Sequence, residues 1–145
     1  MTRPLRITFD LRCAAEHAFA VWTTRTSMWW PADHTVSGEP DVDVVIEPTV
    51  GGRIFERTPS GRESDWGEVT EWDPPRALGY RWHIGRGPEE ATDVRIVFVD
   101  RGDGTSGVEI EHAGWDRFGT DADPRKDANR IGWSSLLPHF VEACR

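Results

Sequence analysis

Apolar and polar residues alternate strictly over residues 5–11, where every second side chain is apolar. This period of two predicts a half-buried β-strand. Over residues 14–24 the apolar residues instead recur at spacings of three and four, which predicts a short amphipathic helix. Thr26 begins a further helical turn. That turn must end near Pro31, because proline disfavours helical backbone in the residue before it.

Apolar runs separated by glycine and proline turns predict six more strands after these helices. Consecutive strands with such short connections favour an antiparallel sheet. In the Asp73-Pro74-Pro75 stretch the prolines cannot join a ladder, so this stretch is expected to form a turn. The predicted strands cover residues 42–47, 52–58, 65–72, 77–84, 94–98 and 108–112.

Residues 127–144 carry an apolar stripe at helical spacing, which includes Ile131, Trp133 and Phe140. Pro138 falls inside this helix and predicts a kink, or an end near Ser135. The apolar face of the sheet needs a cover that only this helix is long enough to provide. We therefore expect an α+β fold, with a curved antiparallel sheet of six to seven strands around a long C-terminal helix and two short helices after the first strand.

Length and charge narrow the class of protein. The 145 residues suit one domain over residues 1–145, and 17 basic against 25 acidic residues give a net charge of −8. This charge disfavours nucleic acid and anionic membrane as partners. The sequence has no apolar run of about 18 residues and no signal-peptide core, so we expect a cytoplasmic protein without a membrane span. Cys13 and Cys144 are expected to be buried free thiols, since they form no CxxC pair.

Four stretches together resemble the activator of heat-shock-protein-90 ATPase homologue family, within the START-like, polyketide-cyclase-like (SRPBCC) helix-grip superfamily. The resemblance covers essentially the whole chain, and it implies a cavity between sheet and long helix that takes an apolar ligand. The superfamily contains lipid carriers, hormone binders, cyclases, oxygenase domains and co-chaperones, so the fold does not fix the function. The stretches are AFAVWTTRTSMWWP, WGEVTEWDPPRALGYRW, VEIEHAGWDRF and GWSSLLPHFVEA.

Large apolar side chains are expected on both walls of this cavity. Such rings either simply fill the core or line a pocket of the usual small-molecule type, apolar with a few polar groups. Our leading hypothesis is the binding of a small hydrophobic or amphipathic ligand without cofactor or metal, since the five histidines form no HExxH or HxH motif. The candidate ligand-binding residues are Trp30, Phe55, Trp66, Tyr80, Trp82, Phe98, His112, Trp133 and Leu137.

The adjacent tryptophans Trp29 and Trp30 cannot both face one core if they are helical, because successive helical side chains point about 100° apart. We expect Trp30 to pack near the cavity mouth and Trp29 to lie toward the surface or a partner. The alternative is that both form a lid over the end of a helix.

A second hypothesis is a cyclase-type or dehydratase-type enzyme that uses His112 and Glu68 for proton transfer. His112 continues an inward series on its strand, where a hydrogen-bonded core role is the alternative. The sequence does not decide whether Glu68 faces inward, because Trp66 shares its face of the predicted strand. If Trp66 is inward, Glu68 is buried and needs a partner such as Arg53 or Arg57. We favour a binding protein over an enzyme.

A third hypothesis, ranked below both, is a module that stimulates the chaperone ATPase. It predicts an exposed apolar patch around Trp29. The sequence also leaves open whether the protein is a homodimer.

Overall fold

The computed structural model describes all residues, 1–145. Seven strands, three α-helices and three short 3₁₀ helices follow one another in nearly the predicted order. The elements are β1 (Leu5–Leu11), α1 (Ala15–Thr24), α2 (Thr26–Trp29), η1 (Ala32–His34), β2 (Asp43–Ile46), β3 (Arg53–Arg57), β4 (Glu63–Asp73), β5 (Ala77–Trp82), η2 (Pro88–Glu90), β6 (Thr92–Asp100), β7 (Ser106–Ala113), η3 (Trp115–Asp121) and α3 (Ala122–Ala143).

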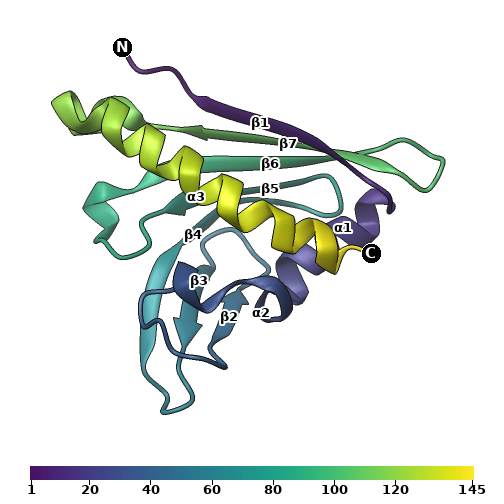
Figure 1. Cartoon of the computed structure of the whole chain (residues 1–145), viewed down its shortest axis with the longest axis horizontal. Helices are drawn as coiled ribbons and strands as arrows, with labels where there is room; N and C mark the ends of the chain where they lie inside the picture. Colours follow the sequence, from purple (N-terminus) through teal and green to yellow (C-terminus); the bar gives the residue numbers. More distant parts are fainter.

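The strands form one antiparallel sheet in the order β1-β7-β6-β5-β4-β3-β2. The sheet curves, and α3 lies diagonally across its concave face (Figure 1). Strands β1 and β2 are neighbours in sequence but lie at opposite edges, so α1, α2 and η1 carry the chain across the sheet. The predicted helix-grip architecture is confirmed. None of the helices is both long and apolar enough to cross a bilayer.

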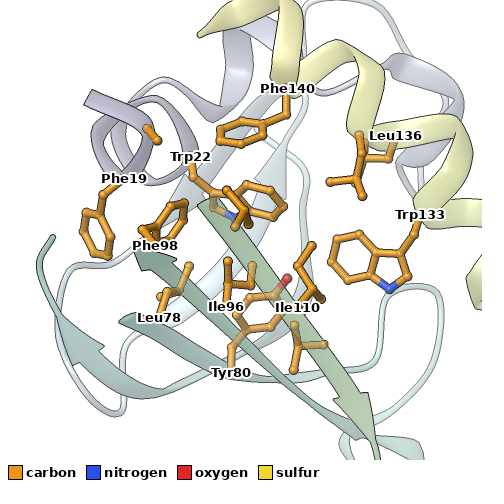
Figure 2. Packing of buried hydrophobic residues seen from close by; sticks show 14 of the residues in the cluster. Phe19, Trp22, Leu78, Tyr80, Ile96, Phe98, Ile110, Trp133, Leu136 and Phe140 are labelled. Atoms are coloured by element: carbon orange, nitrogen blue, oxygen red, sulfur yellow. The ribbon is translucent and has the colours of Figure 1, made fainter. Parts of the chain in front are cut away.

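The core fills the space between the sheet and the helices (Figure 2). Phe140 of α3 packs edge-on against Trp22 of α1, with ring centroids 4.7 Å apart, and against Phe9 of β1 at 6.3 Å. Phe19 packs similarly against Phe98 of β6 at 5.5 Å. These contacts fix α1 and the C-terminal half of α3 to the same part of the sheet.

Helix α3 runs through Pro138 to Ala143, so the predicted end near Ser135 is wrong. Pro138 lies on the exposed face of the helix, as does Ser134, whose carbonyl loses its helical partner. Water can satisfy that carbonyl, so the helix continues. Ile131 is not part of the buried stripe, since 71% of it is exposed.

Strand β4 turns Trp66, Val69 and Trp72 toward the core, although they are three residues apart. Its pairing with β3 is interrupted at Trp66, and its pairing with β5 is interrupted at Thr70. Each β-bulge inserts one extra residue and inverts the alternation of faces. Glu68 is therefore turned outward even though Trp66 is inward.

Both cysteines are free thiols. Cys144 is buried as expected, whereas Cys13 is only partly buried. Burial raises the pKa of the Cys144 thiol to about 12.

Candidate functional site

A pocket of about 340 Å³ opens beside the N-terminal half of α3. The other walls are the end of β5 with the residues after it, and segment 30–36, which follows α2. The volume lies within the range of small-molecule sites, roughly 300–1,000 Å³. The lining is mainly apolar and consists of Trp30, His34, Thr35, Val36, Trp82, Ile84, Gly85, Ala128, Asn129, Gly132, Trp133 and Leu136.

The pocket lies at this end of α3 because the helix presents small residues there. Ala128 and Gly132 are one turn apart on the lining face. A Cβ atom at Gly132 would meet no atom within 4 Å. Farther along α3, Leu137 and Phe140 are buried, and their side chains close the space between helix and sheet.

Segment 30–36 is attached to both neighbouring walls. The Trp30 indole N–H donates to the His34 carbonyl at 2.9 Å, and the Trp30 ring lies 4.9 Å from that of Trp66 and 5.9 Å from that of Trp82. The His34 Nε2 atom lies 3.2 Å from Ser135 Oγ on α3, within hydrogen-bonding distance. Segment 30–36 therefore connects α3 to the sheet and forms one wall of the pocket.

Glu56 on β3 holds the end of segment 30–36 by hydrogen bonds, and the sequence analysis did not identify this residue. Its buried carboxylate accepts hydrogen bonds from the Val36 amide at 2.5 Å, the Ser37 amide at 3.1 Å and the Trp66 indole at 2.7 Å. Burial alone would raise the pKa of Glu56, but these three donors outweigh it and lower the pKa. The sequence could have identified Glu56, because side chains alternate along a strand and residue 56 shares the inward face of Ile54.

The predicted ligand-binding residues separate into groups. Trp30, Trp82 and Trp133 line the pocket, and Trp66 and Tyr80 lie deeper, behind Trp30. The other inward residues belong to the packed core and do not border the pocket; they are Phe98, His112 and Leu137.

Phe55 does not face the cavity, so its place among the lining residues is wrong. It lies on the opposite face of β3, between Arg53 and Arg57, whose guanidinium carbons are 4.0 and 5.3 Å from its ring centroid. The two arginines cover the ring and leave only 3% of the residue exposed. Residues 53, 55 and 57 share this face because side chains alternate along a strand.

His112 is inward, as predicted, but all its polar atoms are engaged in the core. Its Nδ1 accepts the indole N–H of Trp133 at 3.1 Å, its Nε2 lies 2.6 Å from Thr92 Oγ1, and its carbonyl accepts the indole N–H of Trp115 at 2.9 Å. Burial lowers its pKa to about 3, so the ring is neutral at pH 7.

Glu68 points away from the cavity, with 51% of its side chain exposed, and pairs with Arg81 at 3.7 Å rather than with Arg53 or Arg57. The hypothesis that His112 and Glu68 transfer protons in one cavity is therefore wrong. The physical reason is the β-bulge at Trp66. Strict alternation would place Trp66 and Glu68 on the same face of β4, and the bulge places them on opposite faces.

Trp29 is the buried member of the tryptophan pair, and Trp30 is the half-buried one, so the surface position expected for Trp29 is wrong. Only 5% of Trp29 is exposed, and its indole N–H donates to the Val21 carbonyl at 3.0 Å. Trp30 follows the last helical residue in an extended conformation, so the 100° rule does not apply to the pair. The expected apolar patch around Trp29 is thus not formed by that side chain.

Known proteins share this fold over nearly the whole chain. The family described as "Activator of Hsp90 ATPase homolog 1-like protein" matches residues 12–144. Among curated proteins, no relative matches the sequence.

Several solved structures are similar to the chain. An anthrahydroquino-gamma-pyrone synthase, Txn09, complexed with SUM, is 28% identical, with a TM-score of 0.66 over 98% of this chain and 97% of that one. The self-sacrificing resistance protein CalC from Micromonospora echinospora is 24% identical, with a TM-score of 0.70 over 98% and 91%. An HSP90 activator from Plasmodium falciparum, PFC0360w, is 18% identical, with a TM-score of 0.54 over 77% and 72%.

Proposed function

The chain belongs to the family of Activator of Hsp90 ATPase homolog 1-like proteins, and from that premise we propose that it binds a small hydrophobic or amphipathic molecule between sheet and C-terminal helix. The observation that carries the proposal is the apolar pocket of about 340 Å³ beside Ala128 and Gly132. Nothing in the chain fills this space, whereas farther along the helix Leu137 and Phe140 are packed against the sheet.

The lining favours a flat aromatic ligand. Three indole rings, from Trp30, Trp82 and Trp133, border the pocket. Aromatic rings pair well in offset or edge-to-face arrangements. His34, Thr35 and Asn129 supply polar atoms at the rim, where they can orient an amphipathic molecule. The 28% identity to a synthase of an anthrahydroquino-gamma-pyrone supports a polycyclic aromatic compound as the class of ligand.

The test is to fill the pocket from Gly132. Because the position is helical and open, Gly132→Leu places a side chain in the pocket without backbone strain. We expect the affinity for a flat probe, 9-fluorenone, measured by equilibrium dialysis, to fall at least about tenfold. Ser134→Leu, which adds the same side chain on the exposed face of the same helix, should leave it unchanged. Unchanged affinity in Gly132→Leu would refute the proposal, provided thermal unfolding shows both variants folded.

A cyclase-type enzyme is the second candidate, because a synthase is among the similar proteins and His34 borders the pocket. Histidine is a common acid–base group at neutral pH. A ligand copurified with the protein and recovered chemically unchanged would support binding alone. Conversion by the wild type that is lost in His34→Gln would support the enzyme.

A further inference from the structure

Behind the pocket lies a second, much smaller chamber, of about 10 Å³. That volume is close to the minimum that holds one water molecule. Two rings, those of Trp30 and Trp82, border both spaces and thus separate them. The chamber is lined by Trp22, Thr26, Trp30, Val44, Ile46, Ile54, Trp66, Tyr80 and Trp82.

Two polar atoms at this chamber have no partner in the protein, the hydroxyl of Tyr80 and the indole N–H of Trp22. Tyr80 is 3% exposed and Trp22 is 1% exposed. Every side-chain nitrogen or oxygen that is completely sealed from water does have a hydrogen-bond partner. An unpaired polar atom in these residues must therefore border a space that a water molecule can touch, and the chamber is the space that both residues line.

The orientation of Tyr80 agrees with this assignment. Its oxygen points away from the strands, into the region between the sheet and α3 where Trp22 also lies (Figure 2). Burial raises the pKa of Tyr80, so the hydroxyl keeps its proton and remains a donor. Tyr80 and Trp22 therefore each bring a hydrogen-bond donor to the residues that line the chamber.

We propose that this chamber is a subsite for a carbonyl oxygen at the edge of an aromatic ligand, an inference that rests on the proposed function. The Tyr80 hydroxyl and the Trp22 indole N–H donate to that oxygen. An aromatic ketone or quinone therefore fits this site better than a hydrocarbon of the same shape. A ligand without this oxygen would leave the two donors unpaired, which is costly, whereas the carbonyl oxygen can pair with both.

One of the two separating rings must move to admit the ligand edge, and we assign this movement to Trp30, because it lies in the segment that follows α2 rather than on a strand of the sheet. Trp30 is half-buried and follows α2 in an extended conformation, and the only hydrogen bond of its side chain is the local one to the His34 carbonyl. The indole of the neighbouring Trp66 is held in place by the buried Glu56 carboxylate, and that of Trp29 is held by Val21. Trp30 is thus the least restrained of these three rings.

The test compares 9-fluorenone with fluorene, which has the same ring frame without the carbonyl oxygen. By equilibrium dialysis we expect the wild type to prefer fluorenone by about fivefold, the effect of a neutral hydrogen bond. Tyr80→Phe should reduce or abolish the preference and keep the fluorene affinity within about twofold, since the ring is retained. Thermal unfolding checks that this variant is folded.

The possible failures are distinguishable. If fluorene and fluorenone bind equally well to the wild type, or if Tyr80→Phe keeps the full preference, the subsite is wrong while the proposed function stands. If neither fluorene nor fluorenone binds, both the subsite and the proposed function are wrong. Trp30→Ala adds a kinetic readout: faster association of fluorenone supports movement of Trp30, and unchanged or slower association contradicts it.

Discussion

The indole N–H of Trp133 on α3 donates to Nδ1 of His112 on β7 at 3.1 Å. Since Nδ1 is an acceptor, the neutral ring carries its proton on Nε2 and donates to Thr92 Oγ1 on β6. The Thr92 hydroxyl in turn reaches the Trp82 carbonyl at the end of β5, at 3.3 Å. This chain of hydrogen bonds joins α3 to three strands directly behind the pocket.

His112→Leu tests the structural role of this link. The substitution leaves the Trp133 N–H without an acceptor in the core and removes one of the two partners of the Thr92 hydroxyl, so we expect a loss of about 2–4 kcal/mol in the free energy of unfolding. Urea denaturation measures it. Glu68→Gln is the control, and it should change stability by less than about 0.5 kcal/mol because its ion pair is exposed. Equal stability of His112→Leu and wild type would contradict a structural role.

The pKa of His112 predicts a loss of stability in mild acid. In the folded protein burial lowers the pKa to about 3, whereas the unfolded chain has the ordinary value near 6.5. Above pH 6.5 the ring is neutral in both states and adds no pH dependence. Below it only the unfolded chain binds the proton, so the free energy of unfolding should fall by up to about 1.4 kcal/mol per pH unit as the pH drops toward 3.

Imidazole NMR measures this directly. The His112 ring should remain neutral down to pH 4.5, with its proton on Nε2. Titration of this ring near pH 6.5 in the folded protein would show that it is not buried as described.

Glu56→Gln should loosen the wall formed by segment 30–36. Glutamine offers one acceptor oxygen where the carboxylate has two, and its NH₂ group faces donors at Val36, Ser37 and Trp66. Hydrogen exchange at the Val36 and Ser37 amides should become faster, and fluorenone affinity should fall. Glu39→Gln, which removes only an exposed ion pair with Arg62, is the matched control. Unaltered exchange in Glu56→Gln would contradict the role of the carboxylate.

Gly67→Ala tests the bulge that directs Glu68 outward. A Cβ atom at Gly67 would lie 1.9 Å from the Arg81 carbonyl oxygen, so the paired strands would have to separate. We expect a loss of at least about 2 kcal/mol by urea denaturation. Gly132→Ala, in open space on a helix, should instead stabilise the protein by up to about 1 kcal/mol. A neutral Gly67→Ala would mean that the strands are not in close contact at this position.

The succession of strands and helices was readable from the sequence, because periods of two and of three to four depend on local backbone geometry. The alternation that begins at Leu5 and the apolar stripe through Trp133 and Phe140 gave elements close to those observed. The sheet that grips the last helix followed from these elements, because only that helix is long enough to cover the apolar face, and the family motifs agreed with it. The sequence also indicated that tryptophans from separate segments would meet, as Trp30, Trp82 and Trp133 do.

Only the tertiary structure decided which face several side chains take and where the chain leaves space. The face that each side chain of β4 takes depends on bulges in its pairing with β3 and β5. The local sequence around Glu68 therefore could not predict which face Glu68 takes. Trp29 and Trp30 diverge because the helix ends between them, and the engagement of His112 depends on Trp133, 21 residues away. The pocket exists because Ala128 and Gly132 lie opposite large rings from distant segments, and such a volume is a property of the packed whole.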